Sequence, residues 1–180
     1  MSHKVESAFS YRLMAFSYRL RDFLRPRMDI LKEVGIKPGD HVLDYGCGPG
    51  GYITPVAKLA GKKGKIYAVD IHPLAVRMVQ NIAVKKQITG LETYCSDCKT
   101  GIRNNSIDVA LLYDVLHDIK NPGEVLAELH RVLKPNGILS VRDHHMKEEE
   151  ILSGIENKGL FHLVKRGERT YNFSKSTSTD

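Results

Sequence analysis

Short apolar runs alternate with helix-like segments along most of this 180-residue chain. The runs typical of buried strands are residues 42–43, 65–69, 91–94, 107–113 and 138–141. The segments between them that carry apolar residues at helical spacing include residues 52–59, 74–83 and 125–133. Gly90 is expected to end the second of these helices, and residues 135–137 are expected to form a turn before the strand at 138–141. Alternating strands and helices form a parallel sheet, because each right-handed crossover packs a helix back onto the sheet. The alternation therefore predicts a single doubly wound α/β domain with helices on both faces.

The end of the chain departs from this alternation. Residues 147–157 have the pattern of a helix, and residues 161–164 and 170–173 have the pattern of two further strands. The link between these two strands is short enough for an antiparallel pair. We therefore expect a mostly parallel seven-stranded sheet with an antiparallel last strand.

The N-terminal residues have a pattern of their own, which predicts a helical extension. The hexapeptide Ala-Phe-Ser-Tyr-Arg-Leu occurs twice at an offset of seven residues, which is close to two helical turns. Phe9, Phe16 and Phe23 would therefore stack on one face of an amphipathic helix. We expect this helix to pack onto the domain, and the alternatives are a lid over the active site or the interface of a homodimer. A second short helix fits residues 27–34.

Composition excludes some classes of protein. The longest apolar run is far shorter than the roughly 20 residues that a membrane span needs. Arginines interrupt the N-terminal segment where a secretory signal would be apolar, so we expect a cytoplasmic protein without a membrane span. The formal net charge of +6 favours anionic partners. No aromatic–basic motif of an RNA-binding module accompanies that charge, so a nucleic-acid partner has no motif to support it.

The three cysteines do not predict a disulfide framework. Cys95 and Cys98 have the spacing of a metal clip, but there is no second Cys-x-x-Cys or spaced histidine pair near them in the sequence. We therefore predict no metal site.

A glycine-rich segment follows the first strand. Glycines at 46, 48 and 51 match the GxGxxG fingerprint, and Asp70 lies 19 residues after Gly51, where a ribose-binding acid is expected. Alone, this pattern also fits the NAD(P) site of an oxidoreductase. Asp44 directly precedes the turn, however, and would repel a pyrophosphate but suit an ammonium group. Asp97 and Asp114 follow two further strands, and this acidic rim favours a cationic cofactor.

The stretch 42–50 resembles the first motif of class I S-adenosylmethionine (SAM)-dependent methyltransferases. The resemblance continues through further stretches, of which 128–137 is the most specific. These are residues 68–70, 95–97, 107–110 and 128–137. The resemblance is closest to the subgroup of ubiquinone-biosynthesis and arsenite methyltransferases. It implies a Rossmann-like methyltransferase fold, with SAM as cofactor and S-adenosylhomocysteine (SAH) as product. The expected divisions are an extension at 1–33, a SAM-binding domain at 34–175 and a disordered tail at 176–180.

The resemblance also implies roles for single residues. Asp44 would lie near the amino group of the cofactor, and the turn after it would line the methionine part. The residues expected there are Asp44, Tyr45, Gly46, Cys47, Gly48 and Gly50. Asp70 would bind both ribose hydroxyls, for which a carboxylate is well suited.

The adenosine end of the cofactor would meet residues after the second and third strands. Ile71 and His72 would flank the adenosine, and Asp97 would accept from the adenine amino group with Cys98 close by. Asp114, after the fourth strand, would border the sulfonium and the methyl acceptor.

Methyl transfer depends mainly on positioning, and a general base is needed only where the acceptor must lose a proton. His117, His144 and His145 follow the fourth and fifth strands. We predict that His117, and after it His144, acts in catalysis or acceptor binding. Together the three histidines could instead form a metal site or be structural.

The function predicted from the sequence is SAM-dependent methyl transfer, with a small molecule as the expected acceptor. One alternative is a non-catalytic SAM-binding or partner protein. The other is an NAD(P)-dependent oxidoreductase, although no Tyr-x-x-x-Lys constellation for hydride transfer is visible.

Overall fold

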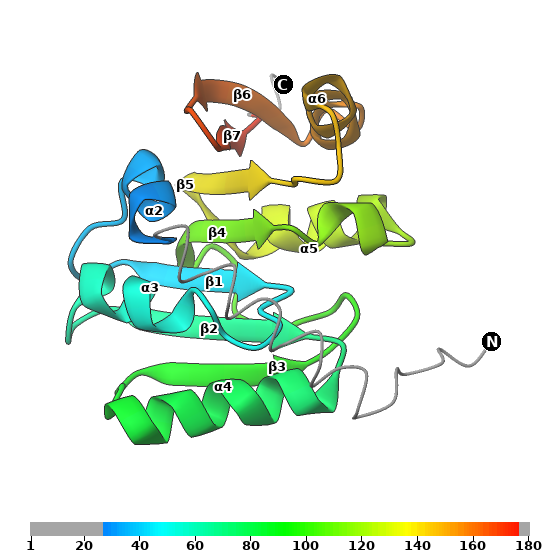
Figure 1. Cartoon of the computed structure of the whole chain (residues 1–180). Coiled ribbons are helices and arrows are strands. Elements are labelled where there is room, and N and C mark those ends of the chain that lie inside the picture. The colour runs from blue at the N-terminus through cyan, green and yellow to red at the C-terminus, as the bar shows by residue number, and fades with distance from the viewer. Residues whose placement is uncertain (1–26, 177–180) are drawn as a thin grey trace.

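The computed structural model describes residues 27–176. Its seven strands form a single sheet in the order β3-β2-β1-β4-β5-β7-β6 (Figure 1). The strands are β1 (His41–Tyr45), β2 (Lys65–Asp70), β3 (Leu91–Cys95), β4 (Ile107–Tyr113), β5 (Leu133–Arg142), β6 (Phe161–Arg166) and β7 (Tyr171–Lys175). Only β7 runs antiparallel to its neighbours, β5 and β6. The predicted mixed seven-stranded sheet is therefore confirmed.

Helices cover both faces of the sheet. They are α2 (Arg27–Val34), α3 (Ile53–Ala60), α4 (Pro73–Lys86), α5 (Pro122–Val132), α6 (Glu148–Glu156) and the short 3₁₀ helix η1 (Leu116–Asp118). The aromatic helix expected before residue 26 lies outside the described residues.

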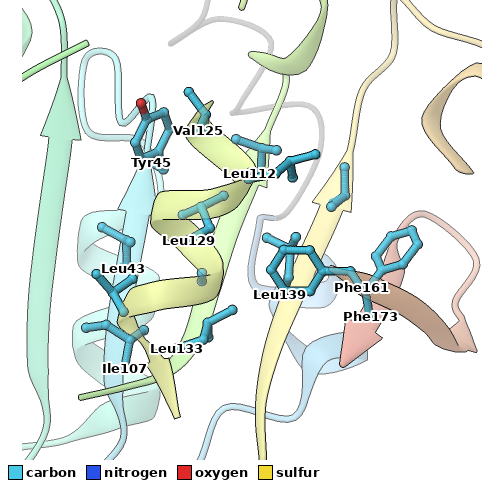
Figure 2. Close-up of a cluster of buried hydrophobic side chains, with 14 of the residues drawn as sticks. Leu43, Tyr45, Ile107, Leu112, Val125, Leu129, Leu133, Leu139, Phe161 and Phe173 are labelled. Carbon is cyan, nitrogen blue, oxygen red and sulfur yellow. The ribbon is translucent and has the colours of Figure 1, made fainter. Parts of the chain in front are cut away.

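The alternation of side chains along the strands builds two apolar cores. On one face, Ile30 of α2, Ile53 of α3 and Val79 of α4 pack with Val42 and Leu111 from the sheet. The opposite core lies beneath α5 and α6, and Figure 2 shows part of it. The residues labelled there are Leu43, Tyr45, Ile107, Leu112, Val125, Leu129, Leu133, Leu139, Phe161 and Phe173. Such two-sided burial explains why β4 is apolar along nearly its whole length.

Most boundaries differ from the sequence prediction by one or two residues, and two differ by more. The helix expected to end at Gly90 ends at Lys86, because Gln87 takes a left-handed conformation (φ +53°) and its N–H caps Ala83 and Val84. The segment 135–137, expected as a turn before a strand at 138–141, lies within β5. There Leu133 pairs with Ile107 across an irregularity in the register, so the strand begins directly after α5.

The strand order places the candidate site. β1 lies between β2 and β4, and the chain crosses in opposite directions on the two sides of β1. In open α/β sheets, ligands bind outside the carboxyl ends of the strands at such a switch point. The arrowheads of β1, β2, β4 and β5 all point to the right-hand edge in Figure 1.

Candidate active site

The turn after β1 is shaped by close contacts that only glycine allows. Gly46 has φ +74°, and a Cβ there would lie 2.6 Å from Cγ2 of Val115. Gly50 has φ +81°, and a Cβ there would lie 2.9 Å from both Val79 and Ile82. The backbone N–H groups of Gly46 and Cys47 both donate to the carbonyl of Val69. The turn thus packs closely against Val115, Val79 and Ile82. Its backbone is the part that a ligand can contact.

Asp70 connects this turn to the end of β2. Its Oδ2 accepts a hydrogen bond of 2.8 Å from the N–H of Gly48, and its Oδ1 accepts one of 2.8 Å from the N–H of His72. Burial raises the pKa of Asp70, while the bonds from His72 and Gly48 oppose the rise. A carboxylate has about four acceptor positions, so these two bonds leave capacity for a pair of ligand hydroxyls.

Asp44 lies buried beneath the same turn, with 2% of its surface exposed. Its Oδ2 has no hydrogen-bond partner in the described part of the chain. Burial raises the pKa of Asp44 to about 7, against the positive charge of Arg27, and the nearby charge of Asp70 adds to the rise. Buried polar atoms normally have a partner, so this oxygen fits a site that a ligand donor completes.

Arg27 is a site residue that the sequence analysis missed. Its guanidinium carbon lies 4.4 Å from the ring centroid of Tyr52, and a side chain at Gly51 would collide with the guanidinium. A positive charge therefore lies over the glycine-rich turn, close enough to Asp44 to act on its pKa. No motif marks Arg27, because it stands in a generally basic stretch far from the turn in sequence.

The loops after β2 and β3 bring the predicted adenosine residues to one edge. Ile71 is 49% exposed, and His72 caps α4 by accepting from the N–H of Leu74. Asp97 is exposed and Cys98 is partly buried. The side chain of Tyr45 instead enters the core (Figure 2), where its hydroxyl donates a bond of 3.0 Å to the carbonyl of Asp97. Its geometry therefore suits positioning of the Asp97 loop rather than direct contact with a ligand.

The ends of β4 and β5 carry the predicted histidines. Asp114 adopts a left-handed conformation (φ +54°) and its N–H donates to the carbonyl of Arg142. Oδ1 of Asp114 lies 2.9 Å from Nδ1 of His144 and 3.6 Å from Nε of Arg142. His144 is thus paired with a residue that was expected to border the acceptor.

Asp143 is a second residue that the sequence analysis did not select. Oδ2 of Asp143 lies 2.8 Å from Nδ1 of His117, and its Oδ1 accepts from the N–H of His145. The rings of His117 and His145 have centroids 4.4 Å apart, and those of His144 and His145 lie 3.8 Å apart. No motif marks Asp143, because its pairing with His117 depends on how β4 and β5 align.

Metal binding at this cluster is a geometric alternative. Single ligand atoms of Asp114, Asp143 and His144 all lie within 4.8 Å of one another. The absence of a metal site stays a prediction.

No helix within residues 27–176 is long and apolar enough to cross a membrane.

Comparison with known proteins identifies the family. The methyltransferase-domain family model matches residues 36–176. O-methyltransferase 3 of Dictyostelium discoideum is 32% identical over 146 residues, which are 74% of this chain and 33% of that protein. The ubiquinone/menaquinone biosynthesis C-methyltransferase of Hydrogenovibrio crunogenus is 30% identical over 134 residues, 73% of this chain and 53% of that protein. The chain thus spans about a third to a half of the length of these curated relatives.

Solved structures share the fold. A SAM-dependent methyltransferase from Aquifex aeolicus superposes with a TM-score of 0.77 at 25% identity, covering 87% of this chain and 93% of that one. The [4+2]-cyclase SpnF has a TM-score of 0.67 at 20% identity, covering 77% and 57%, and shows likeness of fold alone. The chain belongs to the methyltransferase-domain family, and its fold is that of the class I SAM-dependent methyltransferases.

Proposed function

We propose that this protein transfers a methyl group from SAM to a small-molecule acceptor. The observation that carries the proposal is the buried, unpartnered oxygen of Asp44 beneath a turn crossed by the guanidinium of Arg27. A negative and a positive side chain at one turn match the ammonium and carboxylate of an amino acid. A dinucleotide offers a pyrophosphate here, which a carboxylate at the end of β1 repels. The charges therefore favour SAM over NAD(P).

The remaining cofactor residues fit the adenosine part of SAM. Asp70 keeps acceptor capacity for the two ribose hydroxyls. The exposed side chain of Ile71 offers an apolar surface for the adenine ring. Asp97 and Cys98 follow β3 beside it, and Tyr45 holds that loop through the carbonyl of Asp97.

Bound SAM supplies a methyl carbon that is already activated by its sulfonium. The chain's task is then alignment, which contributes roughly 7–11 kcal/mol in well-oriented reactions. The glycine turn and Asp70 hold one reactant at β1 and β2. Asp114, at the end of β4, borders the place where the second reactant approaches.

The names of the relatives suggest which acceptors to test first. They include C-methyltransferases of ubiquinone/menaquinone biosynthesis and a 2-phytyl-1,4-naphtoquinone methyltransferase from Nostoc sp.. We infer that a small aromatic acceptor, a hydroquinone before others, is the most informative first substrate. A homodimer through the N-terminal helix, a cytoplasmic location and domain limits at 33 and 175 remain proposals.

The test is methyl transfer from methyl-labelled SAM to 1,4-naphthohydroquinone, compared between the wild type and Asp44→Asn. We expect labelled product from the wild type and a loss of at least tenfold in kcat/KM in the variant. Asp40→Asn, at the opposite end of β1, is the matched control and should keep its activity. SAH binding without labelled product would reject the hydroquinone, and NADH binding in place of SAH would reject the cofactor.

A further inference from the structure

Two strand ends bring His117 and Asp143 together across 26 residues of sequence. Oδ2 of Asp143 accepts from the backbone N–H of His117 at 3.2 Å and lies 2.8 Å from Nδ1 of the same residue. Oδ1 of Asp143 is held by the N–H of His145 at 3.0 Å. The side chain of Asp143 is fully buried. The carboxylate is therefore fixed on both oxygens, and it fixes the imidazole in turn.

The charge of Asp143 determines which nitrogen of His117 carries the proton. Both oxygens of Asp143 accept backbone N–H bonds, from His117 at 3.2 Å and from His145 at 3.0 Å. Such bonds favour the ionised carboxylate. An ionised carboxylate only accepts hydrogen bonds. Nδ1 of His117 must therefore be the donor, and Nε2 of the neutral ring keeps a lone pair.

The imidazole of His117 remains partly accessible to solvent. The side chain of His117 is 26% exposed, whereas that of Asp143 has no exposed surface. Nε2 lies 3.4 Å from a carboxylate oxygen of Asp118, whose side chain is 79% exposed. The ring of His145 packs against His117 on another side. Movement of the exposed Asp118 side chain would leave Nε2 open to an acceptor hydroxyl.

A metal ion is the competing explanation for this cluster, but the contacts disfavour it. Both oxygens of Asp143 already accept hydrogen bonds. Oδ1 of Asp114 accepts from the N–H of His144 and lies 3.6 Å from the guanidinium of Arg142. A fixed positive charge beside a ligand oxygen opposes the binding of a cation.

We propose that His117, oriented by Asp143, is the general base of the reaction, and that the acceptor carries a weakly acidic hydroxyl such as a phenol or enol. The inference rests on the proposed methyl transfer. Nε2 takes the hydroxyl proton as the acceptor's oxygen bonds to the methyl carbon. The carbon–sulfur bond breaks, and its electron pair stays on sulfur. The proton then passes from Nε2 to water. If the conjugated ring carbon attacks instead, that carbon loses its own proton to water, which restores the aromatic ring, and the oxygen regains its proton from Nε2.

The first test needs no acceptor and reads the tautomer of His117 by ¹⁵N NMR of the whole protein. We expect a proton on Nδ1 of His117 in the neutral ring and loss of this preference in Asp143→Asn. Asp118→Asn is the control and should leave the Nδ1 tautomer in place. A proton on Nε2 in the wild type would overturn the proposal, and so would a tautomer that is unchanged in Asp143→Asn.

The second test measures kinetics with 1,4-naphthohydroquinone and with 4-nitrophenol, which ionises far more readily. In His117→Gln and Asp143→Asn, kcat for the hydroquinone should fall roughly 10²–10⁴-fold, with SAH affinity unchanged. The loss should be smaller for 4-nitrophenol, because its proton is already gone, and a purely structural role would not separate the two substrates. Equal losses, or activity removed by EDTA and restored by Mn²⁺ or Zn²⁺, would contradict the proposal. No turnover of either substrate by the wild type would reject the proposed acceptor. The NMR test of the His117 tautomer would then still decide whether Asp143 orients His117.

Discussion

The backbone N–H of Gly48 donates a 2.8 Å hydrogen bond to Oδ2 of Asp70, which fastens the turn after β1 to the end of β2. The second oxygen of Asp70 accepts from His72, the residue that caps α4. The glycine backbone and the carboxylate expected to bind the ribose therefore form one unit. This arrangement explains how a turn made largely of glycine can hold a ligand in place.

Asp44→Asn should stabilise the protein and weaken its cofactor binding. The pKa of Asp44 is raised from its ordinary value of 3.8 to about 7. Between these values the folded protein holds a proton that the unfolded chain has lost, so stability falls as the pH rises through this window. At pH 8 the free energy of unfolding of the variant should exceed that of the wild type by about 1 to 2 kcal/mol, because the buried amide carries no charge. Urea denaturation at pH 8 measures this.

Binding should respond to Asp44 in the opposite direction. Ionised Asp44 attracts the ammonium group of SAH, so the affinity of the wild type should rise from pH 6 to pH 8. In Asp44→Asn that rise should disappear and the affinity should fall roughly tenfold or more, the range of a hydrogen bond to a charged group. Affinity that is independent of pH in the wild type would count against Asp44 as the ammonium ligand.

Gly46→Ala should destabilise the fold more than Gly101→Ala. Both glycines have positive φ, +74° and +72°, so each alanine meets a backbone strain of about 1 to 2 kcal/mol. Only Gly46 also meets a neighbour, because its new Cβ would lie 2.6 Å from Val115, whereas nothing lies within 4 Å at Gly101. The extra overlap should add about 1 to 3 kcal/mol. Denaturation of both variants gives the difference.

Val115→Ala combined with Gly46→Ala isolates the contact with Val115. The double variant should recover part of the additional loss, because the smaller side chain removes the overlap. Equal losses of stability in Gly46→Ala and Gly101→Ala would show that the turn does not pack closely against Val115.

Glu128→Gln should destabilise the fold at neutral pH and much less in acid. Hydrogen bonds from Arg131 hold the pKa of Glu128 at about 2, against burial and with the help of Thr100. The stabilisation is fully present above the ordinary value of 4.5 and is lost as the pH falls through about 2. The variant should lose about 2 to 3 kcal/mol at pH 7, measured by urea denaturation at pH 7 and pH 3.

Glu124→Gln, on an exposed position of the same helix, is the control and should change stability little. A loss for Glu128→Gln that is equal at pH 7 and pH 3 would contradict the role of charge. Glu128 accepts hydrogen bonds from the N–H and the hydroxyl of Thr100, which lies just after the Cys98 loop. A loosened loop should therefore also weaken SAH binding.

The sequence predicted the sheet and most of the candidate cofactor residues, because these depend on local patterns. Apolar runs marked the strands, and glycines and acids at the strand ends marked Asp44 and Asp70. The end of α4 was wrong because Gln87, rather than Gly90, takes the left-handed conformation. The start of β5 was wrong because pairing of Leu133 with Ile107 continues the strand through the expected turn.

Arg27 and Asp143 could not be predicted because their roles depend on contacts between distant segments. Arg27 reaches the glycine turn only because α2 packs its buried residues Ile30 and Leu31 against the sheet. Asp143 meets His117 only because β4 and β5 align so that Tyr113 pairs with Arg142. Neither register nor helix packing is contained in a short motif.

Calorimetric titration with SAH tests the central claim most directly, with NADH as the competing ligand. The wild type should bind SAH and not NADH. Asp70→Asn should weaken SAH binding by about 1.5 to 3 kcal/mol, roughly 10- to 150-fold, because hydrogen bonds to a charged acceptor are lost. Binding of NADH in place of SAH, or unchanged SAH affinity in Asp70→Asn, would contradict a SAM site at the ends of β1 and β2.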